Sequence, residues 1–554
     1  MSRTGSMTQL LRLARLAERC EQTGGDAAEA IGQEVLRDQG RRRFAQGAMA
    51  AAASAAAAGA MMPTAWAGAA RLTRTALTRM SRSGGVAVVG AGLAGLSCAF
   101  ELARLGINAT VYEADSRGGG RCWSLRNFFP GQVAERGAEF IGTSHHAMLG
   151  YARAFGLQLE DFSMYPGKPF YHFGGQSYTE AQVVEEFRAF ASCIREDLCA
   201  LNYPTADRHT EADALFDFMS LDEYLTLYGA SALLRQVIGA AYAAEFGAGL
   251  DELSAISFLR FVYSDRRSKF GPYGAHSGDH FHVVDGNDRI ATGLAERLPT
   301  PVQFGHKLVS LRKLAGGRVR LSFDRAGRAV QMDHDVVVLA LPFSVLRDVH
   351  LDSSLELPAW KRLAINGTSM GSNAKLMVGF KQPYWYTRHE SNGSGYSDRP
   401  NLQNVWETNP IKGNSTRAVL THHASGAAAR AMTATTLQSD ARAFLGDMDR
   451  AMPGAFDAVQ RNSRGAMLAF SENWSTNTLS KGSYAYPRPG YFTTIAHNEG
   501  KAVGNVLFAG EHTSSFYEWQ GFMEGAALSG LRAAGEACSL IQSQSIPAMV
   551  AGML

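Results

Sequence analysis

The chain has 554 residues, which is enough for two or more domains and a large buried core. Apolar residues make up 46% of it and charged residues 19%, close to an ordinary globular protein and unlike a disordered or collagen-like one. Residues 1–85 hold 12 Arg, no Lys and 6 acidic residues, a net charge of +6. The whole chain has a net charge of +3, so the remaining residues together carry −3. A nearly neutral body without a Lys/Arg run offers no face to displace counterions, and we exclude nucleic acid as a partner.

The first 83 residues resemble an export signal. Arg41-Arg42-Arg43 precedes an Ala-rich stretch that is uncharged from Phe44 to Ala70 and contains Ala65-Trp66-Ala67, a small-residue cleavage pattern. Paired arginines are typical of the twin-arginine route, and the weak hydrophobicity of the Ala-rich segment suits that route better than a membrane anchor. We therefore expect a periplasmic or secreted protein, and whether the chain is cut between Ala67 and Gly68 stays open. An uncleaved cytoplasmic helix is the main alternative, and a membrane anchor is the other.

Cysteine and histidine patterns do not indicate a metal site. None of the six cysteines forms a CxxC pair, and six in a chain of this length do not make a disulfide framework. The pairs His145-His146 and His422-His423 lack the spacing of zinc ligands, and we interpret them as solvated loop residues. The sequence therefore predicts no bound metal.

A glycine-rich turn follows the first buried strand that the pattern predicts, at residues 86–89. Gly90 permits a tight turn, Gly92 lets the backbone approach a pyrophosphate, and Gly95 lets the following helix pack on the strand. A second strand ends at Glu113, whose carboxylate can accept hydrogen bonds from ribose hydroxyls. This arrangement predicts a Rossmann-type dinucleotide-binding unit. The acid argues against NADP, while FAD and NAD share the motif.

The segments after this unit resemble the flavin-dependent amine oxidase family. Arg117-Gly118-Gly119-Gly120-Arg121 is similar to the family's phosphate-side motif, and Gly137-Ala138-Glu139 to the segment that lines the flavin. The most family-specific stretch is near the C-terminus, with Gly510-Glu511 after a strand and Gly521-Phe522-Met523 at the start of a helix. The resemblance extends from about Val86 to Ala534 and implies FAD as the cofactor.

The resemblance also implies the cofactor site residue by residue. The expected FAD-binding residues are Gly90, Gly92, Leu93, Ala94, Gly95, Glu113, Ala114, Gly120, Arg121, Gly137, Ala138, Glu139, Leu308, Gly510, Glu511, Gly521, Phe522 and Met523. Ser483 occupies the place where covalent members of the family carry the cysteine that attaches FAD. We therefore expect non-covalent FAD.

On the reacting side of the flavin, the resemblance implies three catalytic residues. Tyr484 and Phe522 match the two rings that flank the substrate amine, and Lys375 matches the lysine that holds a water against flavin N5. An amine over flavin N5 needs a dry pocket and little help from a protein base. The expected substrate-binding residues are Tyr484, Trp406 and Trp519, and Trp474 is a further candidate for the aromatic wall.

The substrate is less well determined. Residues 281–298 resemble L-amino acid oxidases, so we expect oxidative deamination of an L-amino acid to a keto acid, ammonia and hydrogen peroxide. The arginine that grips the substrate carboxylate in venom-type members is replaced by Glu139-Phe140, and Arg266 or Arg267 would have to serve instead. Without such a cation, an amine or polyamine is favoured, with Glu139 or Glu407 as its charge partner.

Three alternatives stay open beside an oxidase. One is an amine dehydrogenase that uses an acceptor other than oxygen, another is a desaturase-like relative, and the third is a non-catalytic binding protein with a flavin fold. Retained Lys375 and the aromatic pair argue against the desaturase, and the intact FAD motifs against the binding protein. Small-molecule substrate and molecular oxygen are the expected partners, and the oligomeric state stays open, a homodimer included.

The motifs predict an α/β fold of two domains. The Rossmann-type FAD-binding domain is expected to be discontinuous, from residues 84–150, 300–345 and 475–540, and an α+β substrate-binding domain to comprise 151–299 and 346–474. Apolar residues at helical spacing predict helices within 181–265.

Overall fold

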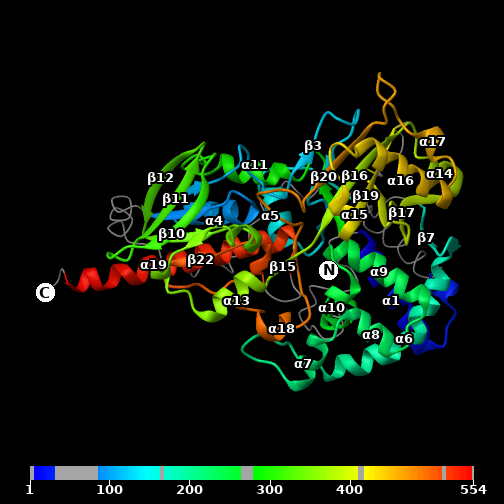
Figure 1. The fold of residues 1–554 in the computed structure, drawn as a ribbon, viewed down its shortest axis with the longest axis horizontal. Coiled ribbons are helices and arrows are strands. Elements are labelled where there is room, and N and C mark those ends of the chain that lie inside the picture. Colours follow the sequence, from blue (N-terminus) through cyan, green and yellow to red (C-terminus); the bar gives the residue numbers. More distant parts are fainter. Residues whose placement is uncertain are drawn as a thin grey trace, which may run out of the picture.

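The computed structural model describes residues 5–31, 85–161, 167–263, 279–409, 417–514 and 519–551. Its two halves differ in architecture. One half holds a small parallel sheet, a long C-terminal helix and a strand meander, and the other holds a larger sheet and a group of helices (Figure 1). The predicted export segment at 41–67 and the pair Arg266-Arg267 lie outside the described residues.

A four-stranded parallel sheet forms the base of the first half. Its order is β2 (Ala109–Tyr112), β1 (Val86–Val89), β13 (Val336–Leu339) and β22 (Val506–Phe508), so neighbours come from stretches far apart in the chain. β1 and β13 are buried at every residue, because parallel strands are covered on both faces. The predicted α/β fold with a Rossmann-type unit is confirmed.

Two helices cover this sheet. α4 (Leu93–Arg104) begins directly after the glycine-rich turn, and α19 (Met523–Ala551) packs along α4. Small buried residues of α19 such as Ala527 and Ala533 join the apolar core of β1 and α4. The N-termini of both helices therefore lie at one edge of the sheet, where the predicted motifs meet.

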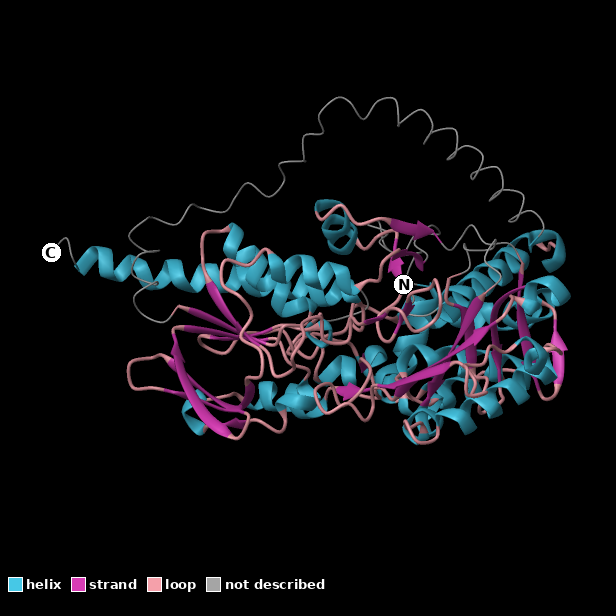
Figure 2. Ribbon diagram, turned by 90° about the horizontal axis from the view of Figure 1, so that it is seen from above, coloured by secondary structure: helices cyan, strands magenta, loops and turns pink. Residues whose placement is uncertain are grey.

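A mainly antiparallel sheet packs on the face of the parallel sheet opposite to α4 and α19 (Figure 2). Its order is β12 (Arg328–His334), β11 (Val319–Arg325), β10 (Lys307–Lys313) and β14 (His350–Leu351), with β14 parallel to β10. In β11, the buried Val319, Leu321 and Phe323 alternate with residues that are more exposed, the pattern of a strand with one covered face. The predicted meander before the buried strand β13 is therefore present.

The second half is built on a seven-stranded sheet. Its order is β20 (Ala469–Asn473), β16 (Asn373–Phe380), β19 (Ala418–Ser425), β18 (Asn404–Glu407), β17 (Ser391–Ser397), β7 (Lys168–Phe173) and β8 (Gln176–Tyr178). β16 and β19 are buried at all eight residues each, so this sheet has covered faces like the parallel one.

Three helices pack against this sheet: α1 (Gly5–Thr23), α6 (Glu180–Ala200) and α9 (Ala232–Phe246). Three more pack with them: α7 (Glu211–Phe218), α8 (Leu221–Leu227) and α10 (Ala255–Tyr263). The helices predicted within 181–265 are confirmed. Thr179, Thr210 and Ser220 each begin one of them with a reciprocal capping box, which satisfies amides that have no partner inside a helix. The sequence therefore marks where these helices begin.

The remaining elements are small sheets, short helices and 3₁₀ turns. The small sheets are β5-β9-β6 (Ile141–Gly142, Asp279–Val283, Leu159–Asp161), β3-β4 (Ser124–Leu125, Ala134–Glu135) and β15-β21 (Ser369–Met370, Ala485–Tyr486). The other helices are α5 (His146–Ala154), α11 (Asp288–Glu296), α12 (Phe343–Leu346), α13 (Ala359–Gly367), α14 (Tyr384–His389), α15 (Gly426–Ala431), α16 (Leu437–Ala451), α17 (Ala455–Ala458) and α18 (Tyr491–Thr494) and the 3₁₀ turns η2 (Leu250–Glu252), η4 (Ser353–Leu355) and η6 (Glu511–Thr513). In the described part of the chain, no helix combines the length and hydrophobicity needed to span a lipid bilayer.

Candidate active site

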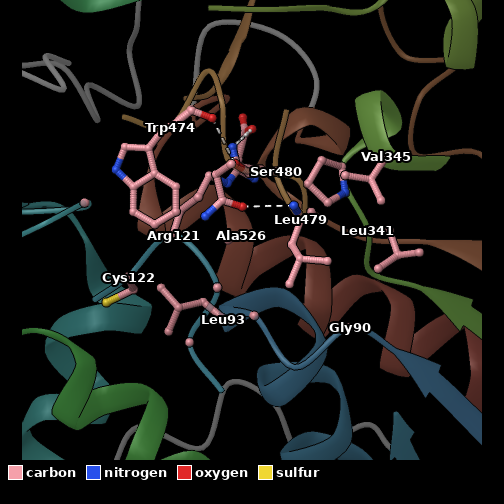
Figure 3. Close-up of a pocket in the computed structure, with 18 of the residues that line it drawn as sticks. Gly90, Leu93, Arg121, Cys122, Leu341, Val345, Trp474, Leu479, Ser480 and Ala526 are labelled. Carbon is pink, nitrogen blue, oxygen red and sulfur yellow. Dashed lines mark hydrogen bonds and ion pairs between the residues drawn. The ribbon is translucent and has the colours of Figure 1, made fainter. Parts of the chain in front are cut away.

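A cavity of about 560 Å³ lies where the carboxyl ends of the parallel strands open. Gly90 follows β1, Glu113 follows β2, Leu341 follows β13 and Gly510 follows β22, and all four line it. Figure 3 shows side chains from distant segments around this space, including Leu93 and Arg121. In open α/β sheets, ligands bind at this edge.

The glycine motif combines two tightly packed positions, Gly90 and Gly95, with an open one, Gly92. A Cβ at Gly95 would lie 1.9 Å from the carbonyl oxygen of Gly90, so only glycine lets α4 pack on the turn. At Gly92, which precedes the helix, a Cβ would find no atom within 4 Å. The backbone at Gly92 therefore borders open space, at the N-terminus of a 12-residue helix that favours an anion.

Glu113 is held at the end of β2 by backbone amides. Its carboxylate accepts hydrogen bonds from Ala91 N (2.6 Å) and Asp115 N (2.8 Å). Burial raises the pKa of Glu113, while these amides act in the opposite direction. Because each carboxylate oxygen has two lone pairs, both oxygens keep an acceptor site for hydroxyl groups in the cavity.

Arg121 and Glu511 join two motifs that are far apart in the chain. The Arg121 guanidinium lies 2.8 Å from a Glu511 oxygen and also donates to the carbonyl of Ser483 at 2.7 Å. Glu511 is 5% exposed and accepts from Ala485 N. The ion pair therefore fixes the loop before β21 between the two motifs, along one wall of the cavity.

Lys375 lies in β16 and is buried against Glu139. Its ammonium donates to Glu139 Oε2 (2.6 Å), Gly137 O (2.7 Å) and Glu135 O (3.0 Å), one acceptor for each of its three hydrogens. Glu139 Oε1 accepts from Trp406 Nε1 at 2.9 Å. A water bound by Lys375 would have to share one of these hydrogens. The negative charge of Glu139 is balanced by Lys375 and is therefore not available for a substrate ammonium group.

Glu407, the other expected partner of a substrate amine, does not line the cavity. It accepts a hydrogen bond from Trp385 Nε1 at 2.8 Å and is 8% exposed. In β18 it alternates with Trp406, which does line the cavity, so the two side chains leave the strand on opposite faces. The prediction of Glu407 as a charge partner is wrong.

Aromatic side chains form the reacting end of the cavity. Tyr484, Phe522, Trp406 and Trp474 line it, and Tyr484 OH donates to Ala244 O of α9 at 2.7 Å. The prediction of Trp519 as a wall residue is not supported, because its ring packs edge-on against Phe522 and His145 and does not line the cavity.

The buried histidines differ from the sequence interpretation. His145, His422 and His423 are 0%, 0% and 6% exposed, and the last two lie in β19. Only His146 among these four is exposed. Burial lowers the pKa of His145 and His422 to about 3, so both are neutral at physiological pH. The interpretation of solvated loop histidines is wrong for His145, His422 and His423, the last two because they belong to a continuous buried strand, whereas His146 is exposed at the start of α5.

His512 provides a test of whether a cofactor fits. It lines the cavity with 0% exposure, both ring nitrogens are buried without a hydrogen-bond partner in the protein, and burial lowers its pKa to about 3. Buried polar atoms normally have partners. A molecule with hydroxyl and phosphate oxygens, such as FAD, would supply them, so the residues present fit the expected cofactor.

Nearly all expected site residues line this one cavity. Those that do are Gly90, Gly92, Leu93, Ala94, Glu113, Ala114, Gly120, Arg121, Gly137, Ala138, Glu139, Leu308, Lys375, Trp406, Trp474, Tyr484, Gly510, Glu511, Gly521, Phe522 and Met523. Gly95 lies just outside and serves packing. Residues that sequence reasoning missed are Asn373, His423, His512 and Phe140. His512 directly follows Glu511 in the chain. Asn373 and Lys375 are two residues apart in β16 and therefore lie on the same face, so period-two spacing would have found Asn373.

Two negative findings limit the chemistry of the site. Within the residues that the structure describes, no group of three or more His, Cys, Asp or Glu side chains could hold a metal ion. Cys122 lines the cavity but is 2% exposed, and burial raises the pKa of its thiol well above the usual value. This thiol is therefore a poor nucleophile.

Comparison with known proteins agrees with this geometry. The model of the flavin containing amine oxidoreductase family matches residues 93–538. An L-amino-acid oxidase from Siganus canaliculatus is 24% identical over 480 residues, which span 83% of this chain and 86% of that protein. The chain therefore belongs to the flavin-containing amine oxidoreductase family.

Solved structures share the fold. Putrescine oxidase with bound putrescine superimposes with a TM-score of 0.69 at 20% identity, over 82% of this chain and 99% of that one. Cyclohexylamine oxidase from Brevibacterium oxydans gives 0.69 at 20% identity, over 83% and 100%. The protein is thus a flavin-dependent oxidoreductase that acts on CH–NH₂ groups, and membership of this family implies a small-molecule substrate and oxygen.

Proposed function

We propose that the protein binds FAD without a covalent bond and oxidises a primary amine to an imine, which water hydrolyses to a carbonyl compound and ammonia, with oxygen reduced to hydrogen peroxide. The choice of an amine as substrate rests on the Lys375–Glu139 ion pair. It leaves the reacting end of the cavity, in the described part of the chain, without an unpaired cation to hold a substrate carboxylate.

FAD, when bound, accepts the hydride from the carbon beside the nitrogen. The residues of this chain exclude water and orient the amine. Tyr484 is fixed by its bond to Ala244 O, Phe522 lies 6% exposed at the start of α19, and Trp406 is held by Glu139. A neutral amine between apolar rings needs no protein base to lose a hydride, which suits an aromatic wall whose described carboxylate, Glu139, is already paired with Lys375.

An L-amino acid is the second candidate, because the curated relative named above is an L-amino-acid oxidase. This substrate requires a cation for its carboxylate. Arg266 and Arg267, the residues expected in that role, lie outside the described residues. The structural neighbours putrescine oxidase and cyclohexylamine oxidase are named after amine substrates, which supports an amine here as well.

A titration distinguishes the two substrates. Under anaerobic conditions, the visible absorbance of the flavin is followed while L-amino acids and their decarboxylated amines are added in pairs. Bleaching by the amine and not by its parent amino acid supports the proposal. Bleaching by the L-amino acid alone, with neither its D-isomer nor the amine active, would assign carboxylate recognition. Air is then admitted, and stoichiometric hydrogen peroxide identifies oxygen as the acceptor.

Non-covalent attachment has its own test. At the position of the family's attachment cysteine, Ser483 carries a hydroxyl that donates to Asn373 Oδ1 at 2.6 Å. Burial raises the pKa of the Cys122 thiol, which also lines the cavity, so this residue offers no thiolate to the flavin. Acid precipitation is expected to leave a colourless pellet and a yellow supernatant. A yellow pellet would overturn this part of the proposal.

A further inference from the structure

The N-terminal helix α1 lies outside residues 93–538, which the family model matches, yet it is built into the core. Leu13, Leu16 and Ala17 are 0–1% exposed and share one apolar cluster with α6 and α9. Figure 1 shows α1, in blue, beside these two helices. The short helical turn at residues 27–31 adds buried Ala27 and Ala30 to the same cluster.

Polar contacts fix α1 in one orientation. Arg12 forms an ion pair with Glu180 at the start of α6, and Arg195 near its end lies 2.6 Å from Glu21. Between them, Arg188 donates to Gly25 O at 2.9 Å. The contacts therefore run along the whole of α6, with charges at both ends and an apolar face between them.

We propose that residues 5–31 are a built-in ligand of the α6–α9 surface, and that this segment stays bound as a separate polypeptide when the chain is cut anywhere between residues 32 and 84. The interaction needs no peptide bond, because its contacts are side-chain packing and ion pairs. A cut after the small-residue pattern Ala65-Trp66-Ala67 would then yield a two-chain protein.

The docked segment also bears on the cavity through α9. α1 packs on α9. Near the C-terminus of α9, Ala244 O accepts hydrogen bonds from Tyr484 OH (2.7 Å) and from Asn373 Nδ2 (3.2 Å). Both donors line the cavity. Loss of α1 would leave one face of α9 uncovered and loosen the support of these two residues, so residues 5–31 position a cavity wall without touching it.

The test uses the full chain with a recognition sequence for a specific protease inserted between residues 32 and 84. After cutting, native size-exclusion chromatography is expected to show the fragment with residues 5–31 eluting with the body, and denaturant is expected to separate them. Separation under native conditions would overturn the proposal. Because this readout needs neither FAD turnover nor substrate, its result is independent of the proposed function.

A matched pair of substitutions tests whether the described surface holds the fragment. Ala17→Asp places a carboxylate at a position with 0% exposure, whereas Ala28→Asp places it at an exposed one. A buried unpaired charge should weaken retention by about a hundredfold or more, so the cut Ala17→Asp protein releases the fragment. The cut Ala28→Asp protein should keep it. Equal retention in both would contradict the proposed interface, and if uncut Ala17→Asp fails to fold, the cut of the unsubstituted chain still decides.

Discussion

Lys375 and Glu139 show how far a single residue can be interpreted from sequence. An isolated lysine among apolar strand residues predicted a functional lysine, but its carboxylate partner lies 236 positions away in the chain. No local sequence pattern indicates that β16 lies beside the segment after β4. Glu139 was expected as a partner for FAD or a substrate amine, and its pairing with Lys375 follows only from the tertiary arrangement.

Replacing only one member of this ion pair should destabilise the fold more than replacing both members by uncharged residues. With side chains 6% and 2% exposed, Lys375→Met leaves Glu139 as an uncompensated buried charge. We expect the free energy of unfolding in urea to fall by about 3–5 kcal/mol. The double substitution Lys375→Met with Glu139→Gln should recover much of this loss. Equal losses in the single and double variants would show that the ion pair does not set this stability.

At the scale of elements, the strand, glycine turn and helix at residues 86–104 could be predicted because each step has a local physical cause. Buried apolar residues form β1, and glycines allow the turn and the start of α4. The order of the strands in the sheet could not be predicted, since β13 and β22 pair across more than a hundred residues and register carries no local signal.

Two glycine substitutions should separate packing from cofactor binding. In Gly95→Ala the new methyl meets Gly90 O, and we expect a loss of about 3 kcal/mol, the upper part of the range for overpacking. Gly92→Ala has φ −71° and open space, so its stability should change by less than about 0.5 kcal/mol. Its methyl lies where phosphates would approach, and FAD affinity should fall about tenfold or more. Unfolding curves and FAD titrations measure both, and unchanged FAD affinity in Gly92→Ala would place the cofactor elsewhere.

Glu524 should make stability depend on pH. At the start of α19, it accepts from Ala147 N (2.8 Å) and Met148 N (3.0 Å) of α5, and burial raises its pKa from 4.5 to about 7. Between these pH values the folded protein holds a proton that the unfolded chain releases, so stability falls as pH rises, by about 3 kcal/mol in all.

Glu524→Gln should remove this share of the pH dependence while it keeps an acceptor for the α5 amides. Glu135, whose pKa burial raises to about 8, acts with the same sign and leaves a smaller slope. Unfolding in urea at several pH values between about 5 and 8 measures the difference. A variant with the slope of the unsubstituted protein would show that Glu524 does not titrate in this range.

For the whole molecule, the cavity depends on segments from both ends of the described body. The sequence predicted which motifs would meet, and the segments that carry them do meet at the edge of the parallel sheet. The packing of α1 on α6 and α9 was not predicted, because the charge and composition of residues 1–83 pointed to a signal and not to a core helix.

Such a composite cavity should couple the cofactor to global stability. If FAD binds only the folded chain, free FAD at about 100 times its dissociation constant should stabilise the protein by about 2.7 kcal/mol. Urea unfolding of the flavin-free protein with and without FAD measures this. Riboflavin, which lacks the phosphates expected at the α4 N-terminus, serves as the control and should stabilise far less. Equal stabilisation by both would exclude the phosphate side of the site.

The ion pair between Arg121 and Glu511 also has a consequence for biosynthesis. At about 5–20 residues per second, a ribosome needs about 20–80 s to proceed from β1 to β22. During that interval Arg121 has no Glu511, and the sheet lacks its last strand. The nascent chain therefore cannot complete its flavin site before Glu511 and β22 have been made.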